Sequence, residues 1–259
     1  MMIAVVIKGP GITEVKKQMD QAIAYGADLV ELRVDLFEER DLEALSQLRD
    51  SYLIPMIFKI TKTCIGDIHK ILSLIPEFID LEYDTSVRYI QEIPAGTELI
   101  LSYHNFDETP QDLEAIYSEM QKIPAKFYKI AVTPKNTVEA LKILCFAKPK
   151  ERLIAIGMGA YGEITRILAP WLECPITYAS LDDDQKSAPG QLKIHTLLDQ
   201  YHFRSLNTET LLYGLIGDPV DRSISDETHN HFMKSTGVNA VYVKMQVVES
   251  QLSSFLHYA

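Results

Sequence analysis

Positive charge is scarce in this sequence, and so are cysteines and long apolar runs. The 259 residues include 25 Lys and Arg against 36 Asp and Glu, which gives a formal net charge of −11 at pH 7. A field of this sign repels nucleic-acid phosphates and anionic membrane surfaces. We therefore expect no nucleic acid and no membrane among the partners, and an anionic substrate would need cations placed locally.

The apolar runs are too short for a signal-peptide core or a membrane span. The first, Ile3 to Ile7, is followed at once by the sequence KGP. The chain has three cysteines, Cys64, Cys145 and Cys174, and they lack the spacing of a zinc site. Their odd number suits a reducing compartment. These features predict a soluble cytoplasmic protein without a metal.

Apolar runs of strand length, rich in β-branched residues, recur eight times. They lie at residues 3–7, 29–35, 54–60, 78–84, 99–104, 127–133, 153–158 and 176–180. The segments between them have helical periodicity. Strands that are apolar along their whole length and alternate with helices indicate a parallel sheet covered by helices. At this length a closed (β/α)₈ TIM barrel is the economical solution, and a doubly wound open sheet is the alternative.

Capping signals predict where several helices begin and end. Residues 113–120 have apolar side chains at i, i+3, i+4 and i+7, with Thr109 as the expected N-cap and Pro110 at the first helical position. Gly26 is expected just after the end of the first helix. Asn136 is expected to cap the helix that stops at Pro149.

A second unit is predicted after the barrel. The last barrel helix is expected at 190–198, a polar linker at 199–210, strands at 211–216 and 239–247, and a helix from 225. This β-α-β unit is too short to bury a core by itself. We therefore expect two parts, a barrel over 1–205 and the truncated start of another α/β domain over 211–259, in a piece of a longer protein.

Polar residues cluster at the predicted carboxyl ends of the barrel strands. In a barrel these positions converge on one mouth. They are Glu31, Arg33, Asp35, Lys59, Lys62, His104, Lys129, Arg166, Ser187 and Gln191. Any one of them alone is more often solvated or paired. Their number at a single mouth favours a site.

Lys129 and His104 are the candidate reactive pair. Lys129 lies in the apolar run FYKIAVT, so its side chain must snorkel or face a pocket. If it is desolvated near other cations, its pKa falls and the amine can attack a carbonyl. His104 ends the run LILSYH and could remove a proton next to the captured carbonyl carbon. The alternatives are a lysine paired with Glu31 or Asp35 and a hydrogen-bonded structural histidine.

Other residues could bind rather than react. Arg33 and Arg166 could hold a carboxylate through bidentate hydrogen bonds. Ser187 and Gln191 lie in the loop sequence SAPGQ and could bind hydroxyl groups. The run of aspartates at 182–184 is interpreted as a solvated charge run, because consecutive side chains do not converge on one cation.

Five stretches match a known family in order and spacing. They are ELRVD from Glu31, SYHNFDETP from Ser102, YKIAVTP from Tyr128, GMGAYGEITR from Gly157 and SAPGQ from Ser187. Together they make the first roughly 200 residues resemble type I 3-dehydroquinate dehydratase. The resemblance implies a Schiff base on Lys129, acid–base chemistry by His104, and a substrate carboxylate on Arg166. The remaining substrate contacts would come from Glu31, Arg33, Lys59, Ser187 and Gln191.

The resemblance implies an activity without metal or organic cofactor. The substrate would be 3-dehydroquinate, dehydrated to 3-dehydroshikimate in the shikimate pathway of aromatic amino acid biosynthesis. Glu31 is expected to hold His104 in position. A homodimer is compatible with the resemblance. Two alternatives remain: a class I aldolase-type Schiff-base barrel, and a non-catalytic barrel that scaffolds an appended dehydrogenase.

One stretch departs from the family. In FKITKTC, the family's arginine is replaced by Lys59, and its glutamate four residues later by Thr63. Lysine keeps the charge but loses the planar fork, and threonine removes a carboxylate. We expect substrate orientation and rate to be affected more than the reaction type.

The second unit resembles the start of a shikimate dehydrogenase substrate domain. The matching sequence is YGLIGDPVDRSISDETHNHF, in which Ser223 and Ser225 would hold shikimate hydroxyls or carboxylate. Arg222 and Asp226 depart from the family's HSxSP motif, which has histidine and proline at these positions. NADP would belong to the missing remainder of that enzyme. We expect no dehydrogenase activity from these 259 residues.

Overall fold

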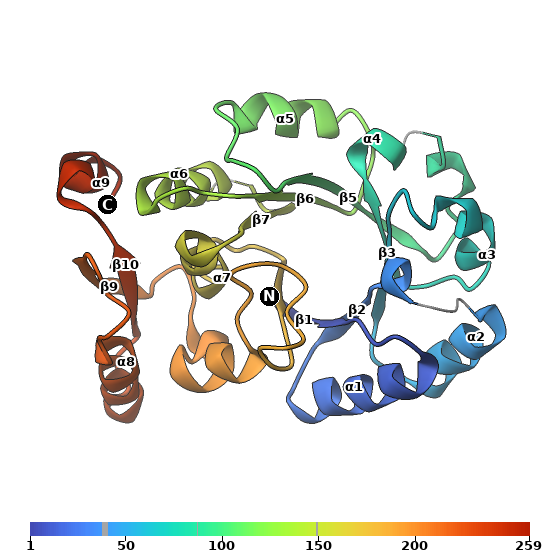
Figure 1. Ribbon diagram of the computed structural model, residues 1–259, viewed down its shortest axis with the longest axis horizontal. Helices are drawn as coiled ribbons and strands as arrows, with labels where there is room; N and C mark the ends of the chain where they lie inside the picture. Colours follow the sequence, from blue (N-terminus) through green and yellow to red (C-terminus); the bar gives the residue numbers. More distant parts are fainter. Residues whose placement is uncertain (38–40, 87, 149) are drawn as a thin grey trace.

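Eight parallel strands form one sheet that curls into a nearly closed barrel (Figure 1). The structure, a computed structural model, describes residues 1–37, 41–86, 88–148 and 150–259. The strands are β1 (Met2–Ile7), β2 (Leu29–Leu32), β3 (Met56–Ile60), β4 (Phe78–Glu82), β5 (Glu98–Asn105), β6 (Phe127–Val132), β7 (Leu153–Gly157) and β8 (Ile176–Ala179). Their hydrogen-bonded order is β7-β6-β5-β4-β3-β2-β1-β8. Within the described residues no ladder joins β7 to β8, so these two strands form a seam. The predicted (β/α)₈ barrel is confirmed, and the open doubly wound alternative is wrong.

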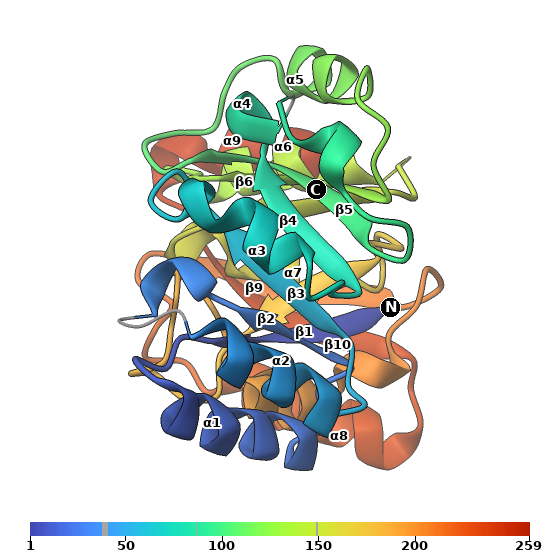
Figure 2. The same cartoon turned by 90° about the vertical axis from the view of Figure 1, so that its right-hand side faces the viewer.

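Helices cover the outside of the barrel less evenly than predicted. They are α1 (Ile12–Ala24), α2 (Leu42–Ser51), α3 (Ile68–Leu72), α4 (Tyr83–Ser86), α5 (Leu113–Met120), α6 (Thr137–Ala147) and α7 (Glu163–Ile167). Figure 2 views the side where α1, α2 and α3 lie. Three of the helices have five residues or fewer. No helix in the described ranges is both long and apolar enough to cross a membrane.

The last barrel helix begins later than the predicted 190–198. Its helical turns run over residues 194–200 and finish as a π-helix, Thr196–Gln200. Gly190 has φ +71°, a left-handed conformation that does not occur inside a right-handed helix. A Cβ at this position would also collide with the backbone of Gly159. The SAPGQ loop therefore occupies the start of the predicted helix.

Two capping predictions are confirmed. The side chain of Asn136 caps α6 by accepting a hydrogen bond from the backbone N–H of Glu139 at 3.0 Å. Gly26 follows the end of α1 with φ +86°, the left-handed conformation expected after a helix C-terminus. The predicted stop at Pro149 lies outside the described residues.

The predicted start of the fifth helix is wrong. Thr109 and Pro110 lie before α5, and Asp112 is its N-cap, accepting from the backbone N–H of Ala115 at 2.8 Å. A carboxylate at this position also interacts favourably with the positive end of the helix dipole. The cap that the chain uses is therefore three residues closer to the apolar stripe.

The barrel strands are buried on both faces. Every residue of β2, β3, β7 and β8 is buried, which is why these strands read as continuous apolar runs. The buried polar residues of the strands are Glu31, Lys59, Asp80, Ser102, Lys129 and Thr177. Charged side chains are rarely buried unless they are paired. These residues must therefore find partners inside the barrel.

A second unit packs beside the barrel, next to α6 and α7 in Figure 1. Its elements are β9 (Leu211–Gly217), α8 (Ser225–Thr236), β10 (Ala240–Gln246) and α9 (Leu252–Tyr258). β9 and β10 pair in parallel, so the predicted β-α-β unit is confirmed. α9, which has no counterpart among the predicted elements, packs against α6. The hydroxyl of Thr137 on α6 donates to the carbonyl of Gln246 at 2.5 Å.

A buried carboxylate ties this unit to the barrel. Asp226, in the first turn of α8, accepts hydrogen bonds from Gln200 Nε2 at 2.8 Å and Tyr201 Oη at 3.1 Å. It also pairs with Lys244 Nζ at 3.2 Å. The stretch predicted as a polar linker is partly packed, because Phe203 is buried and begins a 3₁₀ turn. Asp226, which departs from the resembled motif, therefore serves as a contact between the two parts.

The Asn136 cap generates a stability prediction. Asn136→Ala should lower the free energy of unfolding by about 1 kcal/mol, because the backbone N–H of Glu139 loses its acceptor. For a chain of this size that corresponds to a drop in Tm of roughly 2–4 °C. Asn136→Ser keeps an acceptor without placing a second carboxylate beside Glu139, whose Oε1 accepts from Asn136 Nδ2 at 3.2 Å, and it should retain most of the Tm. Equal Tm values for Asn136→Ala and the parent in thermal denaturation would contradict the assigned cap.

Candidate active site

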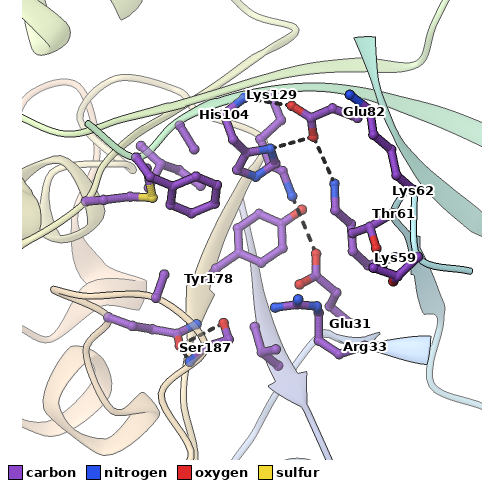
Figure 3. A pocket seen from close by; sticks show the side chains of 18 of the residues that line it. Glu31, Arg33, Lys59, Thr61, Lys62, Glu82, His104, Lys129, Tyr178 and Ser187 are labelled. Atoms are coloured by element: carbon purple, nitrogen blue, oxygen red, sulfur yellow. Dashed lines mark hydrogen bonds and ion pairs between the residues drawn. The ribbon is translucent and has the colours of Figure 1, made fainter. Parts of the chain in front are cut away.

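The carboxyl ends of the strands surround a cavity of about 430 Å³, shown from close by in Figure 3. This is within the usual size range for small-molecule sites. All eight predicted site residues of the barrel line it: Glu31, Arg33, Lys59, His104, Lys129, Arg166, Ser187 and Gln191. Further lining residues include Thr61, Lys62, Thr63, Glu82, Phe106, Met158 and Tyr178. The barrel therefore brings together the residues that the sequence places at separate strand ends.

Lys129 extends from β6 into the barrel and is 4% exposed. Its Nζ pairs closely with Asp80 Oδ2 and lies 3.5 Å from Glu31 Oε2. Burial by itself lowers the pKa of Lys129, but the attraction of Asp80 and Glu31 outweighs it and raises the pKa above its ordinary value. The condition for a lowered pKa, an amine near other cations, is not met, because carboxylates surround the amine more closely than cations do. The alternative of a lysine paired with Glu31 is confirmed, and Asp80 is a second partner.

Asp80 is a central residue that the sequence analysis missed. It lies on β4 in register with Lys59 on β3 and is fully buried. Its Oδ1 accepts from Lys59 Nζ at 2.7 Å and from Ser102 Oγ at 2.6 Å. Burial would raise the pKa of Asp80, but Lys129 and Lys59 hold it well below its usual range. The available signal was the pair of acidic residues, Asp80 and Glu82, inside the otherwise apolar run FIDLEY.

His104 is held by Glu82. Its Nδ1 lies 2.7 Å from Glu82 Oε2, and its backbone N–H donates to Glu82 Oε1 at 2.9 Å. The expectation that Glu31 holds His104 is wrong, because β4 is the neighbour of β5 and β2 lies two strands farther along the sheet. Figure 3 shows the two carboxylates on separate sides of the cavity.

His104 is poised to accept a proton. Burial, and then the charge of Lys59, lower the pKa of the imidazole despite the nearby carboxylate of Glu82. The ring is therefore neutral near pH 7. A neutral ring that donates from Nδ1 to Glu82 keeps its lone pair on Nε2, where it can take up a proton.

The two predicted carboxylate-binding arginines differ. Arg33 uses its fork on Asp35, with Nε 2.8 Å from Oδ1 and Nη2 2.7 Å from Oδ2. Arg166, from α7, is 3% exposed and donates from Nη1 to the carbonyl of Tyr178 at 3.2 Å. Its Nε is buried with no hydrogen-bond partner in the described part of the chain. Burial lowers the pKa of Arg166 to about 10, so it remains cationic at pH 7.

The loop after β8 provides polar groups at another side of the cavity. The backbone N–H and the hydroxyl of Ser187 donate to Gln191 Oε1 at 2.8 and 3.2 Å. The buried side chain of Gln191 is thereby held to the loop through its amide oxygen. Asp183, in the preceding loop, pairs with Lys186 at 2.8 Å and with Lys193 at 3.1 Å.

The exit of β3 carries the departure from the resembled family. Lys59 Nζ is engaged by Asp80 and also donates to Ser102 Oγ at 2.9 Å. Thr63 lines the cavity, and its hydroxyl lies 2.9 Å from that of Thr61. The expected effect on substrate orientation and rate stays a prediction.

Ser223 and Ser225 lie in the second unit and are not among the lining residues of this cavity. Ser223 Oγ donates to Ser225 Oγ at 2.8 Å, and Lys244 Nζ donates to the Ser223 carbonyl at 2.8 Å. The two hydroxyls are therefore adjacent at the start of α8, and their predicted role stays a prediction.

Comparison with known proteins identifies the barrel. Residues 3–208 match the family model described as type I 3-dehydroquinase. The chain belongs to the type I 3-dehydroquinase family. The fold of this family is also seen in the crystal structure of type I 3-dehydroquinate dehydratase from Clostridium difficile with covalently modified comenic acid. That structure is 25% identical to the chain, has a TM-score of 0.68, and covers 80% of this chain and 93% of its own.

Two longer relatives match almost the whole chain, including its second unit. The shikimate biosynthesis protein AroDE of Chlamydia pneumoniae is 34% identical over 98% of this chain and 54% of its own length. The chloroplastic bifunctional 3-dehydroquinate dehydratase/shikimate dehydrogenase of Arabidopsis thaliana is 30% identical over 98% of this chain and 45% of its own length. The chain thus spans about half the length of these relatives.

The contact between Glu82 and His104 generates a second prediction. Glu82→Gln should lower the pKa of His104 further, because the hydrogen-bond acceptor remains while the charge that favours the imidazolium is lost. NMR titration of the His104 ring measures the change. Glu98→Gln, on the exposed start of β5, should leave that titration unaltered. A raised pKa in Glu82→Gln would contradict the electrostatic role assigned to Glu82.

Proposed function

We propose that the barrel dehydrates 3-dehydroquinate to 3-dehydroshikimate, through an imine on Lys129, as a step of the shikimate pathway. The observation that carries the proposal is the buried amine of Lys129 in one cavity with the neutral imidazole of His104. Membership of the type I 3-dehydroquinase family supports the substrate. The positive charge of Arg166 in the same cavity supports binding of a carboxylate on an otherwise acidic protein.

The first half of the mechanism forms the imine. The Lys129 ammonium loses a proton, for which His104 is the neutral base in the cavity, and the amine attacks the ketone carbon. Loss of water gives a protonated imine. Overall, two of the three ammonium protons leave with the water and one remains on the imine nitrogen. The charges of Asp80 and Glu31, which raise the pKa of Lys129, then stabilise the cationic imine as well.

The second half eliminates the hydroxyl group. The imine withdraws electrons, so the neighbouring C–H becomes acidic enough for His104 to take its proton and leave an enamine. The enamine expels the hydroxyl, which departs as water with a proton from His104. Water then hydrolyses the product imine and restores the amine. The imine is the electron sink, so this sequence requires no organic cofactor or metal.

The remaining lining residues are proposed to bind the substrate. Arg166 holds the carboxylate, since its Nε is a buried donor without a protein partner in the described part of the chain. Ser187 and Gln191 hold hydroxyl groups, and Glu31 stays beside the reacting nitrogen. Arg33 and Lys59 supply positive potential: Nε and Nη2 of Arg33 already bond Asp35, and the Lys59 ammonium already bonds Asp80 and Ser102.

We further propose that residues 1–205 are the dehydratase and that 211–259 begin a shikimate dehydrogenase substrate domain. The names and lengths of the two longer relatives support this division. Ser223 and Ser225 would contact shikimate in that domain, and NADP would be bound by the rest of it. The odd number of cysteines supports a reducing compartment such as the cytoplasm.

Lys129→Ala should abolish both turnover and covalent trapping, because it removes the nucleophile. After borohydride reduction with 3-dehydroquinate, mass spectrometry should place the adduct on the peptide that carries Lys129 in the parent protein. His104→Ala should still trap substrate, but more slowly, because the base for imine formation is lost. Its turnover should fall by roughly 10²–10⁴-fold, the usual contribution of a general acid–base. Lys126→Ala, an exposed lysine on the outer surface, serves as the control.

The outcome also separates the alternative functions. Normal turnover with an unmodified Lys129 peptide would overturn the imine mechanism. Dehydration gives a conjugated enone and aldol cleavage does not, so the absorbance of the product distinguishes the two reactions. Binding of substrate without any turnover by the parent protein would favour a scaffold role.

The lowered pKa of His104 gives a pH prediction. The base is lost when the imidazole protonates, so kcat/KM should fall at acidic pH. Because the pKa of His104 is lowered, the fall should occur below the ordinary histidine pKa of about 6.5. The plateau should therefore extend to slightly acidic pH. A pH profile of kcat/KM measures this fall at acidic pH (the acid limb). The acid limb should be absent from the residual activity of His104→Ala. An acid limb above the ordinary value would contradict the assignment.

A further inference from the structure

The hydroxyl of Tyr178 is unusual among the buried tyrosines of the barrel. Tyr128 Oη donates to the carbonyl of Ile123 at 2.9 Å, and Tyr201 Oη donates to Asp226 at 3.1 Å. Tyr178 is 4% exposed, and its Oη is buried without a hydrogen-bond partner in the described ranges. A buried hydroxyl without a partner costs free energy and needs an explanation.

The position of this hydroxyl suggests what its partner is. Tyr178 lies on β8 and lines the cavity, where Figure 3 shows its ring beside Lys129 and Glu31. The Nζ of Lys129 is 4.6 Å from the centre of the ring. Burial, and then the negative charges of Glu31 and Asp80, raise the pKa of Tyr178 well above its ordinary value. The hydroxyl therefore stays protonated near pH 7 and can donate a hydrogen bond.

A second donor without a partner lies against the same residue. Arg166 Nη1 bonds the backbone carbonyl of Tyr178, while Arg166 Nε has no partner in the described part of the chain. Both residues line one cavity, so oxygen atoms of a single ligand there could satisfy both buried donors. A carboxylate suits the guanidinium. The oxygen that approaches Lys129 suits the tyrosine.

We propose that the Tyr178 hydroxyl donates a hydrogen bond to the substrate oxygen on the carbon that Lys129 attacks. This inference rests on the proposed imine chemistry. When the N–C bond forms, the carbonyl π pair moves onto that oxygen, and the Tyr178 O–H stabilises the charge that develops there. The oxygen takes up a proton that the nitrogen lost and that His104 carries across. While the C–O bond breaks, His104 delivers a second proton from the nitrogen to the same oxygen, and the oxygen leaves as water.

The role makes Tyr178 a catalytic residue that acts before elimination. The hydrogen bond strengthens as the oxygen gains charge, so it contributes more to the transition state than to substrate binding. Its loss should therefore affect kcat more than KM. A tyrosine that only fills space would contribute through its ring alone, and phenylalanine would replace it without loss.

Tyr178→Phe tests this directly, because it removes one oxygen atom and keeps the ring. We expect kcat and kcat/KM to fall roughly 10–100-fold. This loss is equal to or somewhat smaller than the usual loss of kcat when one hydrogen-bond donor to an oxyanion is removed. The rate at which borohydride-trappable adduct appears in rapid-quench experiments should fall by a similar factor. The Tm should be unchanged or higher, because no satisfied hydrogen bond is lost.

Tyr128→Phe is the matched control. Its hydroxyl has a protein partner outside the cavity, so this variant should lose some thermal stability and keep the parent kcat. If Tyr178→Phe keeps the parent kcat and adduct rate while the parent protein still traps substrate on Lys129, the role of Tyr178 is wrong and the imine mechanism stands. A change confined to KM likewise overturns it. Absence of any adduct in the parent protein overturns both proposals.

Discussion

One buried carboxylate, Asp80, allows two lysines to share the interior of the barrel. Lys59 and Lys129 would repel each other in a region that water does not screen. Asp80 bonds one ammonium with each oxygen, so the charges are paired although the carboxylate is fully buried. Removing one partner of such a group leaves an uncompensated buried charge, which is strongly destabilising. The position of the Lys129 amine therefore depends on β4, a strand that carries neither of the candidate reactive residues.

The same strand controls the histidine by a separate contact. Asp80 and Glu82 are two residues apart, so both side chains point into the barrel. Asp80 raises the pKa of Lys129, while burial and Lys59 lower the pKa of His104 against the effect of Glu82. The cavity thus holds a charged amine beside a neutral base. That combination suits a reaction in which protons move from nitrogen to imidazole to a departing oxygen.

The fold was predictable from the sequence because its strands are buried on both faces and read as unbroken apolar runs. Helix lengths were less predictable, since loops such as SAPGQ take up residues that also have helical periodicity. The lining residues at strand ends were predictable for the same topological reason. Asp80, Glu82 and Tyr178 were not, because they lie inside strand-forming runs, and only the strand register decides which residues they face inside the barrel. The direction of the pKa shift of Lys129 was unpredictable for the same reason, because it depends on Asp80.

The seam between β7 and β8 has a mechanical consequence. In place of a backbone ladder, side chains of α7 connect these strands: Thr165 Oγ1 accepts from the Gly157 N–H at 2.8 Å, and Arg166 donates to the Tyr178 carbonyl at 3.2 Å. Arg166 therefore belongs both to the wall of the barrel and to the cavity. An anion held by its remaining donor adds a crosslink across the least continuous part of the sheet. Ligand occupancy and the rigidity of this wall are then thermodynamically linked.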